Sequence, residues 1–189
     1  MFQKIKQFVR ILLKPLARKI IGINPNTLTL SGLLVSLVSA VFFARREVLA
    51  AGVLLLASGF FDALDGEVAR ENNRITRFGG FLDSVSDRFA DAGVLIGVMY
   101  GGLAAFSYFP GWFVGVLAIV GSFMVSYTRA RAEAAGAEAS VGVGERAVRV
   151  MIIVIGAFIN RLNWAVLLVA ILSFVTVFQR IAFVRKSLK

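Results

Sequence analysis

Apolar side chains dominate long stretches of this chain, and short polar or charged stretches separate them. A transmembrane helix needs roughly 20 predominantly apolar residues to cross the hydrocarbon core of a bilayer. Six stretches meet or approach that length, so the pattern predicts an all-α integral membrane fold with six transmembrane helices. Their predicted ranges are 27–44, 48–70, 79–101, 111–133, 145–160 and 163–184.

The first 22 residues show a different pattern, in which apolar and basic positions share a helical rhythm. Apolar residues three or four positions apart lie on one face of a helix, which leaves the basic residues on the other. We therefore predict an amphipathic juxtamembrane helix over 1–22, lying on the membrane surface, followed by one membrane domain over 23–189. The basic residues expected at the lipid headgroups are Lys4, Lys6, Arg10, Lys14, Arg18 and Lys19.

The charge of the chain adds an orientation to this picture. A net charge of +10 can indicate nucleic-acid binding, but here long apolar runs separate the charges. We therefore predict no nucleic-acid partner and contact with anionic membrane lipids instead. Of the 21 lysines and arginines, 17 lie in the N-terminal arm, at the C-terminal end and in the connections after the second and fourth stretches. Basic residues are enriched on the cytoplasmic side, so both termini are predicted there, in the cell membrane.

Four aspartates interrupt the second and third apolar stretches. Asp62 and Asp65 are three residues apart, and Asp83 and Asp87 are four apart, so each pair shares one face of its helix. The short connection between the stretches predicts antiparallel neighbouring helices, with the four carboxylates converging just below the cytoplasmic surface. Ionised carboxylates are costly at membrane depth, and they normally face a polar cavity or a partner.

The chain contains no histidine and no cysteine, so any bound metal must have mostly oxygen ligands. Four close carboxylates repel one another unless cations neutralise them. This predicts one or two Mg²⁺ or Mn²⁺ ions, and a pair of ions is able to clamp a pyrophosphate. Two alternatives are an ion or proton pathway and simple ion pairing. The arginines available for pairing are Arg70, Arg74, Arg77 and Arg88.

The spacing of these residues resembles the signature of the CDP-alcohol phosphatidyltransferase family at every specified position. It reads Asp62-x2-Asp65-Gly66-x2-Ala69-Arg70-x8-Gly79-x3-Asp83-x3-Asp87. The resemblance implies two divalent ions held by Asp62, Asp65, Asp83 and Asp87, with Asp87 as the catalytic general base. It also implies a homodimer and a pocket for the CDP group. The residues implied for that pocket are Asp62, Gly66, Ala69, Arg70, Gly79 and Asp83.

Several arginines flank the predicted site, which favours an anionic, phosphate-bearing acceptor; the alternative is that they anchor helix ends at anionic headgroups. Three stretches, Ser-Tyr-x-Arg-Ala-Arg-Ala-Glu at 126–133, Glu-Arg-x-x-Arg at 145–149 and Gln-Arg at 179–180, resemble the inositol-phosphate-using subgroup of the family. That subgroup often has lysine where this chain has Arg129, and the two side chains bind phosphate with different geometry. The residues thereby implied in binding the acceptor phosphate are Arg129, Arg131, Arg146, Arg149 and Arg180.

The resemblance implies one reaction. The lipid phosphoryl group of CDP-diacylglycerol or CDP-archaeol passes to a hydroxyl of inositol phosphate, and CMP is released. Glycerol-3-phosphate and, less favoured, serine are alternative acceptors. A small transporter is the alternative from another class, but the uncharged connection at 103–110 offers no relay for ions. A non-enzymatic scaffold leaves the four membrane-embedded acids unexplained.

Overall fold

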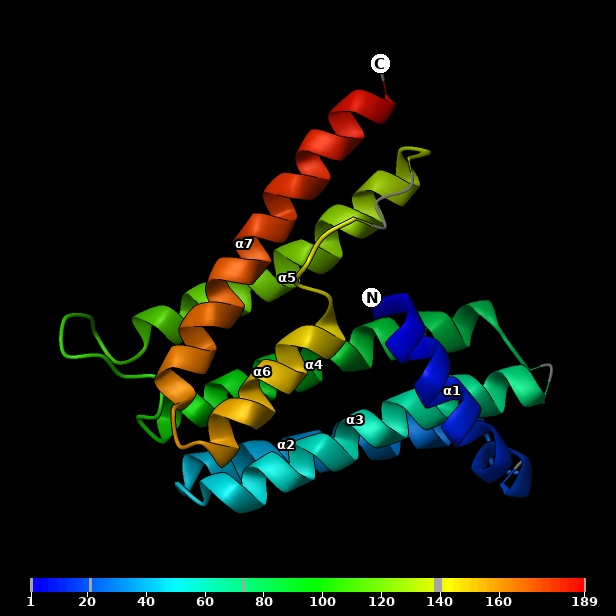
Figure 1. Cartoon of the computed structure of the whole chain (residues 1–189), viewed down its shortest axis with the longest axis horizontal. Coiled ribbons are helices and arrows are strands. Elements are labelled where there is room, and N and C mark those ends of the chain that lie inside the picture. Colours follow the sequence, from blue (N-terminus) through cyan, green and yellow to red (C-terminus); the bar gives the residue numbers. More distant parts are fainter. Residues whose placement is uncertain (1, 21, 73, 138–140, 189) are drawn as a thin grey trace.

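The computed structural model describes residues 2–20, 22–72, 74–137 and 141–188, with side chains from residue 11 onward. Over this part of the chain, seven α-helices follow one another (Figure 1), which confirms the predicted all-α fold. The helices are α1 (Phe2–Lys19), α2 (Pro25–Ala44), α3 (Val48–Glu71), α4 (Arg77–Tyr100), α5 (Phe113–Ala134), α6 (Arg146–Phe158) and α7 (Leu162–Ser187).

Four of these helices, α2, α3, α5 and α7, are long and apolar enough to cross a membrane. Helix α4 has 24 residues, but one side of it carries Asp83, Asp87 and Asp91. Helix α6 has 13 residues, so it is about 20 Å long, which is less than the roughly 30 Å of a hydrocarbon core. All six predicted stretches therefore form helices, and four of them qualify as spans by their own length and composition.

Helix α2 is the centre of the N-terminal half, because both α3 and α4 pack against it. Small residues permit this close approach: the Ser58 hydroxyl donates to the Gly32 carbonyl at 2.9 Å, and the Ser39 hydroxyl donates to the Ala51 carbonyl at 2.7 Å. The sequence predicted α3 and α4 as direct neighbours. Instead each packs mainly on α2, and residues of α2 line the space between them.

The glycines of α4 serve this packing within the chain. A side-chain carbon at Gly93 would meet Leu37 of α2, and one at Gly97 would overlap the backbone at Ala40. Such close contacts between helix backbones require small residues. These glycines therefore account for the seam between α4 and α2 of one molecule.

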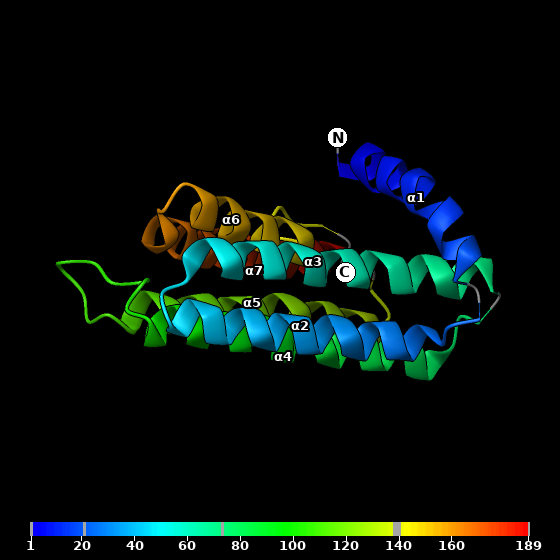
Figure 2. The same ribbon diagram turned by 90° about the horizontal axis from the view of Figure 1, so that it is seen from below.

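Helix α1 lies at the N-terminus, across the outer side of α3 and away from α4 (Figure 2), while its amphipathic, membrane-surface character stays a prediction. Leu13 and Ala17 pack against Leu64 and Val68 of α3. At the end of α3, Glu71 pairs with Lys14 at 3.2 Å and with Arg18 at 2.8 Å. The side chains of residues 2–10, including Lys4, Lys6 and Arg10, lie outside the described residues.

Helices α5 and α7 run beside each other and cross the α2–α4 layer at an angle (Figure 1). The short helix α6 lies between α3 and α7 and contacts both. The largest apolar core joins α2, α3 and α4 to α5, α6 and α7, and it includes Phe43, Val98, Val154 and Val166. This core fixes the start of α6 opposite the acidic faces of α3 and α4.

Candidate active site

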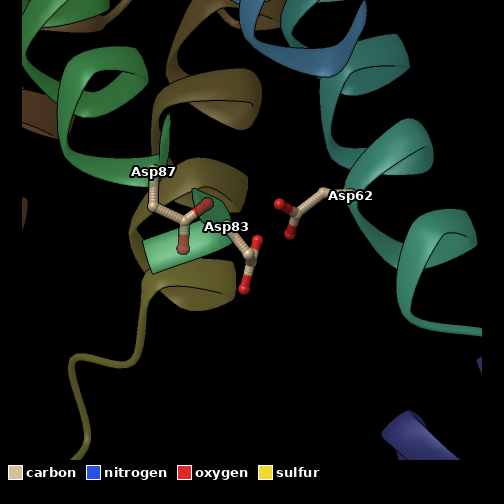
Figure 3. Close-up of side chains that lie close together, drawn as sticks. All are labelled: Asp62, Asp83 and Asp87. Carbon is tan, nitrogen blue, oxygen red and sulfur yellow. The ribbon is translucent and has the colours of Figure 1, made fainter. Parts of the chain in front are cut away.

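Three carboxylates converge in the space between α3 and α4. Asp62 comes from α3, and Asp83 and Asp87 come from α4 (Figure 3). One oxygen from each lies within 4.8 Å of the other two. On α4, the spacing of four residues places both carboxylates on one side of the helix. The helix begins in a fixed register because the Thr76 hydroxyl caps it, accepting from the Gly79 N–H at 2.9 Å.

Asp65 lies beside this group and makes a different contact. Its Oδ2 accepts a hydrogen bond from the Thr29 hydroxyl of α2 at 2.5 Å, and its side chain is buried. The predicted convergence of four carboxylates is therefore a cluster of three with the fourth adjoining it. Asp65 and Asp83 line the same cavity, so both face one space. Metal binding by these four residues stays a prediction.

That cavity has a volume of about 190 Å³ and lies between α3, the start of α2 and the start of α4. Asp62, the remaining member of the residue set predicted for CDP, lies next to this cavity in a smaller cleft. Thr29, Gly32, Asp87 and Arg146 also line this cleft, which we call the acidic cleft. The other five predicted CDP residues all line the cavity: Gly66, Ala69, Arg70, Gly79 and Asp83. Sequence spacing thus identified residues that share one cavity, while their role in binding CDP stays a prediction.

A second buried acid on α3 holds the Arg70 side chain in place. Glu67 is buried, and its Oε2 accepts from Arg70 Nε at 3.0 Å and from a terminal nitrogen of the guanidinium at 2.8 Å. The guanidinium consequently lies over Gly66, 3.4 Å from where a side-chain carbon would stand there. Glu67 occupies a position that the family signature leaves open, so sequence reasoning missed it.

Arg146, at the start of α6, reaches into the acidic cluster. One of its terminal nitrogens lies 2.9 Å from Asp62 Oδ1 and 2.7 Å from Asp87 Oδ1. Its Nε lies 3.3 Å from Asp91 Oδ1. The alternative of simple ion pairing thus has some support, although the main cation comes from α6. Among the arginines expected for it, Arg88 lies 3.6 Å from Asp87.

The other predicted acceptor arginines fall into two groups. Arg149 and Arg180 are buried: Arg149 donates to Asp91 at 2.8 Å and to the Gly144 carbonyl at 2.6 Å, and Arg180 donates to the carbonyls of Val141 and Val125. Arg129 and Arg131 are exposed at the end of α5. Arg129 pairs with Glu133 at 2.9 Å. It also lines a second open cavity of about 760 Å³, which borders Asp83 and Arg88.

The acidic cluster thus lies where two cavities meet, because Asp83 lines both. Among the described residues, two arginines pair with these three carboxylates: Arg146 contacts Asp62 and Asp87, and Arg88 lies 3.6 Å from Asp87. Formal negative charge therefore exceeds positive charge in the cluster. Carboxylate oxygens are the ligands that hard divalent cations prefer, so the donor set fits Mg²⁺ or Mn²⁺. Asp91 was missed as a partner of α6, although its position four residues after Asp87 places it on the same face of α4.

This chain is similar to known proteins in both sequence and fold. A profile of the CDP-alcohol phosphatidyltransferase family matches residues 22–178. The chain is 42% identical to archaetidylinositol phosphate synthase of Pyrococcus horikoshii, over 98% of this chain and 95% of that protein. Two crystal structures of Mycobacterium tuberculosis phosphatidylinositol phosphate synthase are also similar, each 30% identical.

One of these crystal structures contains manganese and citrate, has a TM-score of 0.82 and covers 91% of this chain and 88% of the other. The second has CDP-DAG bound, a TM-score of 0.81, and covers 91% of this chain and 92% of the other. Apolar helices long enough to span a bilayer agree with these matches in indicating a membrane protein. The chain belongs to the CDP-alcohol phosphatidyltransferase family, whose members are transferases for substituted phosphate groups.

Proposed function

We propose that this enzyme transfers the lipid phosphoryl group of a CDP-lipid, CDP-diacylglycerol or CDP-archaeol, to a hydroxyl of inositol phosphate and releases CMP. The observation that carries the proposal is the acidic cluster at the junction of two cavities, one of them lined by the signature residues. The names of the similar proteins support the acceptor, since they are inositol phosphate lipid synthases from archaea and bacteria.

In this reaction the donor would occupy the cavity beside α2. Arg70, held by Glu67, would contact a donor phosphate, and Gly66, Ala69 and Gly79 would leave room for the nucleotide. Asp62, Asp65, Asp83 and Asp87 would hold one or two Mg²⁺ or Mn²⁺ ions. When bound, such ions neutralise the pyrophosphate and the leaving CMP.

Asp87 would act as the general base. It takes the proton from the acceptor hydroxyl, whose oxygen forms a bond to the phosphorus that carries the lipid alcohol. The bond from that phosphorus to the bridging oxygen of CMP breaks, and CMP leaves with the electron pair. The proton on Asp87 then passes to solvent, so each turnover consumes one donor and one acceptor.

The acceptor would approach from the other side of Asp83. Arg146 already reaches the cluster, and Arg129 lines the cavity that borders Asp83. Arginines bind phosphate and carboxylate through two parallel N–H donors, so they suit an anionic acceptor, and the names of the similar proteins favour inositol phosphate among such acceptors. The full set proposed for the acceptor phosphate is Arg129, Arg131, Arg146, Arg149 and Arg180.

We further propose a membrane arrangement for the chain. Helices α4 and α6 would complete six spans, with their charged faces turned toward the protein interior, and α1 within 1–22 would lie on the surface beside the domain of 23–189. Both termini and the acidic cluster would face the cytoplasm at the cell membrane, following the distribution of basic residues. Two copies would associate as a homodimer.

The proposal is tested with purified protein in nanodiscs, given a CDP-lipid and Mg²⁺ or Mn²⁺. CMP release should depend on inositol phosphate and stay at background with glycerol-3-phosphate or serine. Release with glycerol-3-phosphate alone would remove the acceptor assignment and leave the reaction class in place. Ion flux through liposomes without CMP release would favour the transporter alternative instead.

A further inference from the structure

We infer that Asp91 is a positioning residue, which aims Arg146 at the acidic cleft and thereby sets the affinity for the anionic acceptor. The inference rests on the proposed function and adds a residue that the family signature does not specify. Asp91 lies one helical turn beyond Asp87 on α4, and its carboxylate lies outside the cluster of Asp62, Asp83 and Asp87.

Both oxygens of Asp91 are engaged by arginines of α6. Oδ1 accepts from Arg146 Nε at 3.3 Å, and Oδ2 accepts from a terminal nitrogen of Arg149 at 2.8 Å. The side chain of Asp91 is 13% exposed, and those of Arg146 and Arg149 are 21% and 5% exposed. The Asp91 carboxylate therefore pairs with two arginines that are mostly shielded from solvent. A neutral amide at this position would not supply the negative charge that both arginines contact.

The contact between Asp91 and Arg146 orients the Arg146 guanidinium. A guanidinium is planar, and its five N–H donors are fixed relative to one another. Because Asp91 engages Nε, the terminal nitrogen on the other side of the guanidinium reaches Asp62 and Asp87. An anionic group that enters the cleft therefore meets donors that are already oriented.

Arg149 anchors this arrangement to the rest of the fold. Besides Asp91, it donates to the Gly144 carbonyl at 2.6 Å, and the Gly144 N–H donates to the Thr176 hydroxyl of α7 at 2.8 Å. Asp91 is thus connected through Arg149 to α7, and the start of α6 is held between α4 and α7. The position of Arg146 follows from this connection.

The experiment compares two carboxylates that each pair with two basic side chains. In Asp91→Asn, the KM for inositol phosphate should rise about tenfold, the scale of a lost interaction with an oriented charged group, while the KM for the CDP-lipid should change less than about twofold. The matched control is Glu71→Gln at the C-terminal end of α3, which loses the ion pairs with Lys14 and Arg18 of α1. This variant should leave both KM values unchanged.

A double-mutant cycle separates positioning from a purely structural role. In the Arg146→Lys background, Asp91→Asn should add little to the rise in acceptor KM, because its effect acts through Arg146. Additive effects, or an equal rise in both KM values, would overturn the inference. If Asp91→Asn does not fold, Asp91→Glu takes its place: it keeps the charge, moves Arg146 by one methylene, and should raise the acceptor KM alone.

A wild-type enzyme that uses glycerol-3-phosphate would contradict the proposed acceptor but not this inference, because the same cycle is then run with glycerol-3-phosphate. An acceptor KM that Asp91→Asn leaves unchanged, for whichever phosphorylated acceptor the wild type uses, would contradict the role of Asp91.

Discussion

The two sides of the acidic cluster are built differently. On the α2–α3 side, the signature residues line an open cavity, and the Arg70 side chain is about 40% exposed. On the α6–α7 side, Arg149 and Arg180 are buried and already donate to protein acceptors. The first side resembles an open binding site, whereas the second resembles a framework of buried arginines that donate to protein groups.

This difference predicts which substitutions should change substrate binding and which should change the stability of the fold. An exposed charge with one neighbouring partner contributes little to folding, so its loss should appear mainly in substrate affinity. A buried arginine that donates to backbone carbonyls removes a donor from each of them when it is substituted, so its loss should appear in stability in addition to any effect on acceptor binding. Arg146 belongs to both sides, because it is anchored by Asp91 and touches Asp62 and Asp87.

The largest expected effect lies at the cluster itself. Asp87→Asn should lower CMP release by about a thousandfold, since it removes the proposed base, while the thermal melting curve keeps its cooperative shape. CMP release is measured with CDP-lipid and acceptor at saturation. Turnover within a few-fold of wild type would rule out Asp87 as the base and would place the chemistry elsewhere.

On the buried side, Arg180→Ala should destabilise the protein by about 2–3 kcal/mol, because the Val141 carbonyl loses its donor from Arg180 and the Val125 carbonyl keeps the Thr128 hydroxyl but loses Arg180. In a thermal melt this corresponds to a fall in Tm of roughly 5–10 °C. Arg131→Ala, an exposed arginine at the end of α5, is the matched control and should leave Tm unchanged. Equal Tm values for both variants would break the comparison.

On the open side, Arg70→Ala should raise the KM for the CDP-lipid about tenfold, the scale of one lost charge-assisted contact to phosphate. Its Tm should fall less than that of Arg180→Ala, because the Arg70 side chain is about 40% exposed and only the buried Glu67 loses its partner. Arg74 lines the same cavity, so Arg74→Ala is the control for the loss of one positive charge there. Its donor KM should rise less than that of Arg70→Ala. If Arg70→Ala lowers Tm without changing the donor KM, the two sides do not differ as described.

The smallest expected effect concerns the register of α4. Thr76→Ala removes the hydroxyl that caps the helix and should cost about 1 kcal/mol of stability, whereas Thr76→Ser should cost almost nothing. The measurement is again a thermal melt of both variants. A similar loss in the two would mean that the methyl group of Thr76, and not its hydroxyl, stabilises the start of α4.

Much of the open side could be predicted from the sequence because its geometry is local. Gly66, Ala69 and Arg70 share one helix, and a short connection links it to Gly79 and Asp83, so helical spacing is enough to bring them to one cavity. The separation of Asp65 from the cluster was not predictable in this way. It depends on Thr29, which lies 36 residues earlier on α2.

The buried side could not be predicted, because its partners are distant in the sequence. Arg146 and Arg149 meet Asp91 across 55 and 58 residues, and that contact exists only once the shared core has placed α6 opposite α4. The sequence also predicted α3 and α4 as direct neighbours, whereas α2 lies against both. Hydropathy gives the length of a helix, but which helices are adjacent is decided by complementary packing of small residues.

In the proposed reaction, Asp62, Asp83 and Asp87 hold divalent cations beside the donor. Crystals grown with Mn²⁺ and CDP-lipid would test it through anomalous diffraction at the manganese edge. We predict one or two peaks at about 2.0–2.6 Å from oxygens of these three residues. Manganese bound only elsewhere, with the carboxylates of the cluster still paired to Arg146 and Arg88, would contradict the account.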